Sequence, residues 1–340
     1  MSSEHSESSG DVSVIIPAYQ AESTIARALD SVLAQTVLPA EVIVIDDGSR
    51  DRTREIVNAY VRRETPCAFH LIEQKNLGAG AARNRGLLAS DSRLVAFLDA
   101  DDEWLPEKLS RSLVTMKTTS ADIVSHDYLR ADDDSSSHIE CARNFARRPA
   151  PFVDYFLRGY IATSTVVARR QLLMDAGGFD PSLRAGQDYE LWLAAISRAD
   201  MRHHVFGEAL TRYHVTADSI TSQVELRRST SWRTLRRHFP ALKGRCRSPR
   251  TVAMMRAGII YLQAAQAYRS AGNSLGALSA ILRLPFRVVS VLAFRAGGKV
   301  DRPNFFFEAT IIADGAAADL RPENHDPVCR GHASSFRPDE

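Results

Sequence analysis

The 340-residue sequence predicts an α/β protein with a mostly parallel sheet flanked by helices and a helical C-terminal appendage. Two observations carry this prediction. Short apolar runs rich in β-branched residues alternate regularly with helical patterns, and polar clusters follow three of these runs. Regular alternation of strand and helix favours a parallel sheet covered on both faces. Apolar residues at 44% and charged residues at 25% are ordinary for a soluble protein with a real core.

The elements can be assigned in order along the chain. Strands are predicted over Val12–Pro17, Glu41–Ile45, Phe69–Ile72 and Leu94–Leu98. Helices are predicted between them, over Ser23–Leu33, Thr53–Val61 and Ala81–Ala89. Further along, Thr163–Val167 is typical of a strand, and Asp188 opens a helix. Ligands of such sheets bind beyond the carboxyl ends of the strands, so the polar residues there are the candidate site.

Three carboxylates follow the strand at Leu94–Leu98, within the segment Asp99-Ala100-Asp101-Asp102. Mg²⁺ and Mn²⁺ prefer oxygen ligands and are commonly held by one or two carboxylates, with water and substrate phosphates completing the shell. The segment therefore indicates a divalent cation bound to a diphosphate. Its structural alternative is a solvated acidic turn.

Two more clusters lie at strand ends or open helices. Asp46-Asp47-Gly48-Ser49 fits a turn that leads into a helix cap, or a site where Asp47 accepts hydrogen bonds from a nucleobase or ribose. The Gly-rich segment from Asn76 to Gly86 opens a helix, where backbone N–H groups and Arg83 or Arg85 could meet phosphate. It lacks the ending of a P-loop, and no Gly-x-Gly-x-x-Gly follows the first strand. A nucleoside triphosphatase and a nicotinamide dehydrogenase are therefore disfavoured.

The order of these motifs resembles the inverting family 2 glycosyltransferases of GT-A fold, over residues 11–222. The resemblance implies a metal-dependent hexosyltransferase that moves a sugar from a nucleotide-diphosphate donor, a UDP-sugar being favoured, to a hydroxyl of a glycan or lipid-linked acceptor. It implies a Mn²⁺ or Mg²⁺ motif of Asp99, Asp101 and Asp102. It also implies donor-nucleotide contacts from Pro17, Ala18, Tyr19, Asp47, Arg83, Asn84, Asp99 and Ala100.

Gln187-Asp188 resembles the Glu-Asp pair that the family usually carries, with Gln187 in place of the glutamate. The resemblance implies that Asp188 is the general base. A carboxylate there could accept the proton of the acceptor hydroxyl as that oxygen attacks the anomeric carbon. The structural alternative is a simple helix cap.

The segment Arg212–Thr221 resembles the closing motif of the family, in which a histidine approaches the diphosphate or the metal. Alignment on Tyr213 and Ser219 puts Thr216 at that position. His214 is therefore a candidate metal ligand that substitutes for the usual histidine, or a structural residue nearby.

Basic residues with Trp232 and Phe239 dominate residues 223–298, which we expect to form a helical region. It either contacts an anionic membrane surface or packs on the catalytic domain with solvated arginines. Nucleic-acid binding is disfavoured, because no recognised module accompanies the charges. Leu275–Phe294 approaches the length of a membrane span but contains Arg283, Pro285 and Arg287, and we do not assign it as one.

The ends of the chain and its cysteines complete the expectations. Residues 1–10 are expected to be a disordered leader, and residues 299–340 a flexible tail. The four cysteines form no Cys-x-x-Cys pair, which fits a reducing compartment. We therefore expect a cytoplasmic protein, or one peripheral at the cytoplasmic face of the membrane, with a role in cell-envelope polysaccharide biosynthesis by analogy.

Two other functional classes remain open. A sugar nucleotidyltransferase would also use metal carboxylates, but it should carry a Gly-rich phosphate loop after the first strand, where this chain has Pro17-Ala18-Tyr19-Gln20. A catalytically silent sugar-nucleotide-binding or scaffold protein is the non-enzyme alternative. The presence of Asp99, Asp101 and Asp188 argues against it.

Overall fold

The computed structural model of the chain describes residues 11–132, 135–146, 151–198, 200–214, 223–294 and 300–306. The predicted leader at 1–10, most of the predicted tail and Thr216 lie outside these residues. The strands are Val12–Ala18 (β1), Glu41–Asp46 (β2), Ala68–Glu73 (β3), Leu94–Phe97 (β4), Glu103–Trp104 (β5), Ile123–His126 (β6), Tyr128–Asp132 (β7), Ser135–Ile139 (β8), Val167–Arg169 (β9), His203–Phe206 (β10) and Thr211–His214 (β11).

Helices alternate with these strands and then continue alone. They are Ile25–Leu33 (α1), Thr53–Arg62 (α2), Ala79–Ala89 (α3), Lys108–Thr119 (α4), Cys141–Ala146 (α5), Pro151–Arg158 (α6), Arg170–Asp175 (α7), Gln187–Ile196 (α8), Val224–His238 (α9), Pro249–Ser270 (α10) and Ser274–Ser290 (α11). Short 3-10 turns cover Thr163–Thr165 (η2), Phe239–Leu242 (η4) and Val291–Ala293 (η5).

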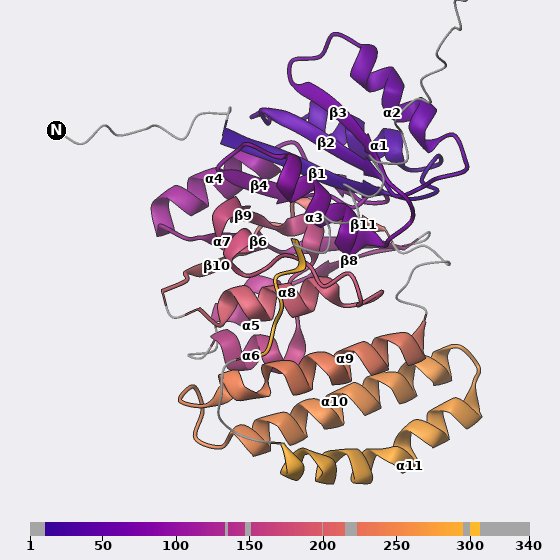
Figure 1. Cartoon of the computed structure of the whole chain (residues 1–340), viewed down its shortest axis with the longest axis vertical. Helices are drawn as coiled ribbons and strands as arrows, with labels where there is room; N and C mark the ends of the chain where they lie inside the picture. Colours follow the sequence, from indigo (N-terminus) through magenta and orange to yellow (C-terminus); the bar gives the residue numbers. More distant parts are fainter. Residues whose placement is uncertain are drawn as a thin grey trace, which may run out of the picture.

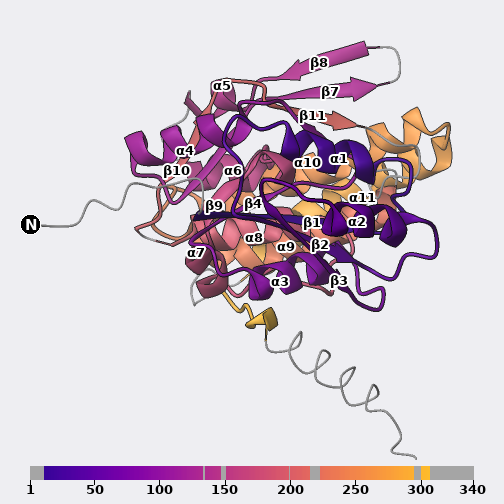
Figure 2. The ribbon, with the colours of Figure 1, turned by 90° about the horizontal axis from the view of Figure 1, so that it is seen from above.

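A seven-stranded sheet in the order β10-β6-β9-β4-β1-β2-β3 forms the centre of the fold, and β5-β11-β7-β8 form a second sheet. Helices flank the larger sheet, and α9, α10 and α11 stack together beyond it (Figure 1). Seen from above, β7, β8 and β11 lie to one side of the large sheet (Figure 2). The α/β architecture with a mostly parallel sheet and C-terminal helices is confirmed.

The strand predicted at Thr163–Val167 is wrong in its first half. Backbone hydrogen bonds from Thr165 N to Ala162 O and from Val166 N to Thr163 O, each 3.0 Å long, close a 3-10 turn instead. The strand β9 begins only at Val167, and it runs antiparallel between β4 and β6. Its place in the sheet puts η2 beside the end of β4.

Strand β1 lies in the middle of the sheet, and its apolar sequence follows from that place. All seven of its residues are buried, because β2 and β4 flank it and helices cover both faces. Helix α3 approaches β1 closely at Gly86. A Cβ added there would come within 2.4 Å of Ile15 Cγ2, so only glycine fits at this contact.

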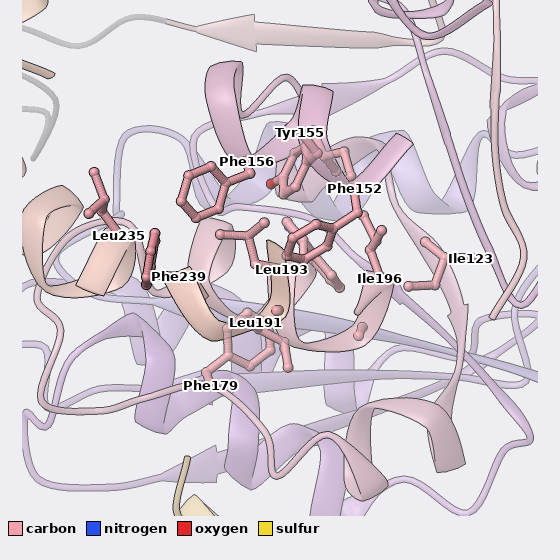
Figure 3. Close-up of a cluster of buried hydrophobic side chains, with 14 of the residues drawn as sticks. Ile123, Phe152, Tyr155, Phe156, Phe179, Leu191, Leu193, Ile196, Leu235 and Phe239 are labelled. Atoms are coloured by element: carbon pink, nitrogen blue, oxygen red, sulfur yellow. The ribbon is translucent and has the colours of Figure 1, made fainter. Parts of the chain in front are cut away.

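One apolar core joins the sheet to the C-terminal helices. Leu191 and Leu193 of α8 pack with Phe152 and Phe156 of α6, and Leu235 of α9 and Phe239 of η4 belong to the same cluster. Figure 3 shows these side chains facing one another across the three helices. The helical C-terminal region is therefore packed on the α/β domain through a continuous core.

Residues 300–306 return to this core, which corrects the expectation of a flexible tail over this stretch. Arg302 donates hydrogen bonds to both carboxylate oxygens of Glu190 in α8, and Phe305 N donates to Gly177 O at 2.9 Å. Glu190 also binds Arg237 and His238 of α9. Burial alone would raise the pKa of Glu190, but the hydrogen bond from His238 and the charge of Arg302 outweigh it and lower the pKa.

Among the described residues, Ser274–Ala293 is a 20-residue helical stretch with a mean hydropathy of 1.7, long and apolar enough to cross a membrane by length and composition alone. Helix α11 runs through Pro285 without a break, as the predicted helical region requires. Only 17% of the apolar window is buried within the protein. The exposed remainder needs a separate explanation.

We expect Gly86→Ala to destabilise the protein, because the added methyl group must displace Ile15 in the centre of the sheet. Overpacking of this kind costs about 1–3 kcal/mol. Gly258→Ala in α10 is the matched control, since no atom lies within 4 Å of its added Cβ. Urea denaturation followed by circular dichroism should show a lower free energy of unfolding for Gly86→Ala. It should show a higher one for Gly258→Ala, because alanine favours helix more than glycine does. Equal midpoints would contradict this account of the packing.

We expect Glu190→Gln to lower the free energy of unfolding by about 3 kcal/mol, because it leaves the buried Arg302 without its counter-charge. Glu208→Gln is the control: its partner Arg111 is exposed, so water already solvates both groups and the change should be small. The same denaturation experiment compares them. Similar losses of unfolding free energy in the two variants would contradict the stabilising role assigned to the ion pairs of Glu190.

Candidate functional site

The carboxyl ends of β1, β2 and β4 meet where the order of the sheet reverses. β1 pairs in parallel with β2 on one side and with β4 on the other. In open α/β sheets, ligands bind in the crevice outside such a reversal. Tyr19, Asp47 and Asp99 each follow one of these strands directly or after one residue. The structure therefore brings Tyr19, Asp47 and Asp99 to one edge of the sheet.

Asp47 fixes the Gly-rich loop to the end of β2. Its Oδ1 accepts hydrogen bonds from Gln74 Nε2 at 2.7 Å and from Leu77 N at 2.8 Å, and its Oδ2 accepts one from Gly78 N at 2.8 Å. Gly78 has a φ of 90°, which favours glycine. A carboxylate has about four acceptor positions. Asp47 therefore retains little capacity for a nucleobase unless this loop rearranges.

The neighbouring acidic residues form the turn and helix cap that the sequence also allowed. Asp46 accepts a hydrogen bond from Ser49 N at 3.1 Å, and Asp51 Oδ1 accepts one from Thr53 N at 3.1 Å. At the end of β1, Pro17 and Ala18 are buried, whereas Tyr19 is 49% exposed. Of these three predicted nucleotide contacts, Tyr19 alone presents its side chain to solvent at this edge.

Arg83 of α3 reaches the end of β4 and is almost fully buried. Its Nη2 donates a 2.5 Å hydrogen bond to Asp99 Oδ1. Burial works to lower the pKa of Arg83, but the charges of Asp99, Asp188 and Asp101 raise it. Its Nε and Nη1 have no hydrogen-bond partner among the described residues. Two buried donors thus remain for an anionic or hydroxylated ligand.

Asp101 and Asp102 have different environments. The Asp102 carboxylate is buried, accepting from Ser164 Oγ at 2.5 Å and from His214 N at 3.1 Å, so both of its oxygens are engaged. Asp101 is partly exposed, and no side chain among the described residues donates a hydrogen bond to its carboxylate. Burial, followed by the charge of Asp99, raises the pKa of Asp101 to about 6. Asp101 is therefore the carboxylate best placed to receive a cation.

The 3-10 turn η2 connects the acidic segment to Asp188. Ser164 Oγ accepts from Asp99 N at 3.1 Å while it donates to Asp102. The adjacent Thr163 Oγ1 donates to Asp188 Oδ2 at 3.1 Å. Asp188 lies in the first turn of α8, partly exposed, and its Oδ1 accepts from Tyr189 N at 2.7 Å. Two consecutive residues of η2 thus hold the carboxylate of Asp188 and the carboxylate of Asp102.

Two of the predicted donor contacts, Asn84 and Ala100, have buried side chains. Asn84 is fully buried: its Nδ2 donates to Phe179 O at 2.8 Å, and its Oδ1 accepts from Phe179 N at 2.7 Å. Its amide therefore holds the turn at Phe179. Ala100 is buried in the apolar cluster below the sheet edge, so its side chain packs in the core.

His214 ends β11 near the acidic segment, as a metal ligand would. Its Nε2 lies 3.7 Å from Glu103 Oε2 and has no hydrogen-bond partner among the described residues. Burial and then the charge of Arg27 lower the pKa of His214, which favours the neutral ring that binds metals. The structure thus places His214 close to Asp102, to which its backbone N–H donates.

Sequence reasoning missed two residues of this site. Arg27 of α1 donates from Nη2 to Asp101 O at 2.6 Å. Burial raises the pKa of Tyr213 in β11, and the negative charges of four nearby carboxylates raise it further. These carboxylates are Asp102, Asp99, Asp101 and Asp188. Tyr213 could have been found, because it anchors the closing motif. Arg27 lies on a helix far from any motif and gave no signal in the sequence.

The donor set fits a hard divalent cation that shares its ligands with a substrate. No group of three or more His, Cys, Asp or Glu side chains in the described part of the chain is arranged to hold a metal by itself. Mg²⁺, however, usually keeps only one or two carboxylates, with phosphates and water completing its shell. Asp101, with Asp99 as its neighbour, meets that requirement once a diphosphate is present.

Sequence comparison finds relatives among glycosyltransferases. The family model "Glycosyl transferase family 2" matches residues 13–174. The chain is 32% identical over 215 residues to TuaG of Bacillus subtilis, which is named for teichuronic acid biosynthesis; the match covers 62% of this chain and 81% of TuaG. It is 40% identical over 115 residues to an uncharacterized glycosyltransferase of Nostoc sp., covering 34% of this chain but only 35% of that relative.

Solved structures share the fold at low sequence identity. TarS of S. aureus, residues 1–349, in complex with UDP-GlcNAc, has a TM-score of 0.60 and 17% identity, covering 92% of this chain and 93% of TarS. The mannosyltransferase PcManGT of Pyrobaculum calidifontis, in complex with GDP-Man and Mn²⁺, has a TM-score of 0.58 and 19% identity, covering 92% and 81%. The motifs, the fold and the match to TuaG agree, and this chain belongs to glycosyltransferase family 2, with a GT-A fold.

Proposed function

We propose that the chain transfers a sugar from a nucleotide-diphosphate donor, a UDP-sugar being favoured, to a hydroxyl of a glycan or lipid-linked acceptor. The observation that carries this proposal is the cluster of Asp99, Asp101 and Asp188 around the buried guanidinium of Arg83 at the strand ends. TarS binds UDP-GlcNAc and PcManGT binds GDP-Man, on the same fold. A nucleotide sugar is therefore the ligand class that fits this edge of the sheet best.

Charge is arranged there for a donor diphosphate. Asp101, with Asp99, would hold Mg²⁺ or Mn²⁺, and His214 is a further candidate ligand. The bound ion would stabilise negative charge on the departing diphosphate. The Nε and Nη1 of Arg83 have no hydrogen-bond partner among the described residues, and in this proposal they bind a phosphate or a sugar hydroxyl. The neutral pairing of Arg83 with Asp99 keeps this guanidinium in place before the donor arrives.

Asp188 is the general base in this proposal. Its Oδ2 is oriented by Thr163, and the carboxylate is partly open to solvent, so it can accept a proton from an acceptor hydroxyl. Direct attack by that oxygen on the anomeric carbon would invert the configuration in one step. Such a displacement needs no covalent nucleophile from the protein.

The names of the relatives suggest the kind of product. TuaG is named for teichuronic acid biosynthesis, and ExoO of Rhizobium meliloti, 30% identical over 226 residues, for succinoglycan biosynthesis. The match covers 64% of ExoO and 64% of this chain. On the basis of these names, we propose a polysaccharide precursor as the acceptor of this chain.

We expect one nucleoside diphosphate, UDP or GDP, to raise the thermal midpoint only when Mn²⁺ is present, because a ligand that binds the folded state alone stabilises it. CMP, a monophosphate, is the nucleotide control. Asp101→Asn should abolish the Mn²⁺-dependent part of the shift. Asp91→Asn is the matched control, since Asp91 is exposed and away from the site. A shift that persists in Asp101→Asn would remove this residue from the metal site, and no shift with any nucleotide would favour a silent scaffold.

We expect Asp188→Asn to lower the turnover number by about 10²- to 10⁴-fold, the usual contribution of general base catalysis. The amide keeps the hydrogen bond with Thr163 but cannot take a proton at neutral pH. Donor binding, measured by the thermal shift with UDP and Mn²⁺, should stay at the parent level. Full turnover in this variant would exclude Asp188 as the base, whereas lost donor binding would assign it to the donor site.

A further inference from the structure

Helix α11 carries two separate apolar stripes, and only one of them has a partner. The inner stripe packs on α10 and comprises Ala277, Ala280, Leu284, Val288 and the adjoining Val291. The outer stripe repeats at the same helical spacing and faces away from the protein. Its residues and their exposed fractions are Leu275 at 81%, Leu278 at 53%, Leu282 at 62%, Phe286 at 78% and Val289 at 61%.

This exposure is concentrated on α11 and its short extension. Seven of the thirteen exposed large apolar side chains in the described part of the chain lie between Leu275 and Leu292. Single exposed apolar residues are normal on a protein surface, but a continuous stripe marks a surface that meets an apolar partner. α11 forms the outer edge of the helical stack in Figure 1, so a large partner could approach it.

The charge of this region selects the partner. Residues 223–294 contain thirteen arginine and lysine residues and a single acidic residue, Glu225, although the whole chain carries a net formal charge of only +2. On α11 itself, Arg283 and Arg287 are exposed and lie on one flank of the outer stripe, one turn apart. No acidic residue occurs on α11. An anionic surface with an apolar interior therefore matches both the stripe and the arginines.

Two features favour a helix that lies on the membrane over one that spans it. The inner stripe of α11 is already occupied by α10, and α10 is tied to the α/β domain by the hydrogen bond from Arg256 Nη1 to Leu157 O, 2.8 Å long. Arg283 and Arg287 lie near the middle of the apolar stretch, where a spanning helix would place them deep in the hydrocarbon. At the bilayer surface, both guanidinium groups can reach lipid phosphates.

We propose that α11 docks this protein on an anionic lipid bilayer, with its outer stripe inserted among the lipids and Arg283 and Arg287 at the headgroups. A second copy of the chain is the other apolar partner to consider. A symmetric contact through α11 would bring two strongly basic regions together, and like charges oppose that contact. Docking of this kind fits a cytoplasmic protein peripheral to the membrane. The inference is independent of the donor and the acceptor.

Co-sedimentation of the full chain with vesicles tests the proposal. Vesicles of phosphatidylcholine with phosphatidylglycerol should bind the chain, vesicles of phosphatidylcholine alone should bind it weakly, and added salt should reduce the binding. The double variant Leu282→Glu/Phe286→Glu should lower the bound fraction roughly tenfold or more, because two inserted side chains are lost. Val61→Glu/Val114→Glu adds the same charge at exposed apolar positions of α2 and α4 and should bind like the parent.

Three results would overturn the proposal. The first is equal vesicle binding by the α11 variant and the parent, which would assign binding to the arginines alone. The second is the absence of binding to either vesicle. The third is a dimer of the parent in sedimentation velocity that the α11 variant dissociates, which would assign the stripe to a second copy. Matching circular dichroism spectra and thermal midpoints for all variants exclude misfolding as the cause.

Discussion

The charge balance around Arg83 is the constraint on which the site depends. A buried guanidinium is costly unless carboxylates accompany it, and this one has Asp99 in direct contact and Asp101 and Asp188 within electrostatic reach. The carboxylates in turn lie close to one another. Burial, and then the negative charges of Asp99 and Asp101, raise the pKa of Asp102. A divalent cation would offset the repulsion among the carboxylates, and a negatively charged ligand would accept hydrogen bonds from the guanidinium. A nucleoside diphosphate bound to Mg²⁺ or Mn²⁺ has that composition.

The rest of the fold holds this balance in place. The turn η2 binds Asp99 and Asp102 through Ser164 and binds Asp188 through Thr163. Helix α8, whose first turn carries the proposed base Asp188, is held two residues further on by Glu190, whose partners come from α9 and from residues 300–306. The C-terminal helices therefore support the position of Asp188. If α11 docks on a membrane, the same rigid core connects the bilayer to the site.

Much of the fold was predictable, because local patterns and burial agree in β1 to β4 and in α1 to α3. Asp99, Asp101 and Asp188 could be selected as candidate site residues from their positions after a strand or at a helix start. The sequence could not show that Asn84 and its neighbour Arg83 have different surroundings. In the structure the Asn84 side chain binds the turn at Phe179, whereas that of Arg83 reaches Asp99. The antiparallel β9 and the turn before it were missed because Thr163–Val167 has strong β propensity, while the hydrogen bonds that bend it depend on its tertiary neighbours. The docking of Arg302 on Glu190 joins residues 112 positions apart, which no local pattern reveals.

The most direct test of the donor site is a crystal structure of the full chain with UDP and Mn²⁺, with the anomalous signal of manganese used to locate the ion. We expect a manganese peak bound to the Asp101 carboxylate, diphosphate oxygens on its other side, and the base near Tyr19 and Asp47 at the ends of β1 and β2. A nucleotide bound away from the ends of β1, β2 and β4, or a manganese ion without contact to Asp99, Asp101 or Asp102, would contradict the account given for this site.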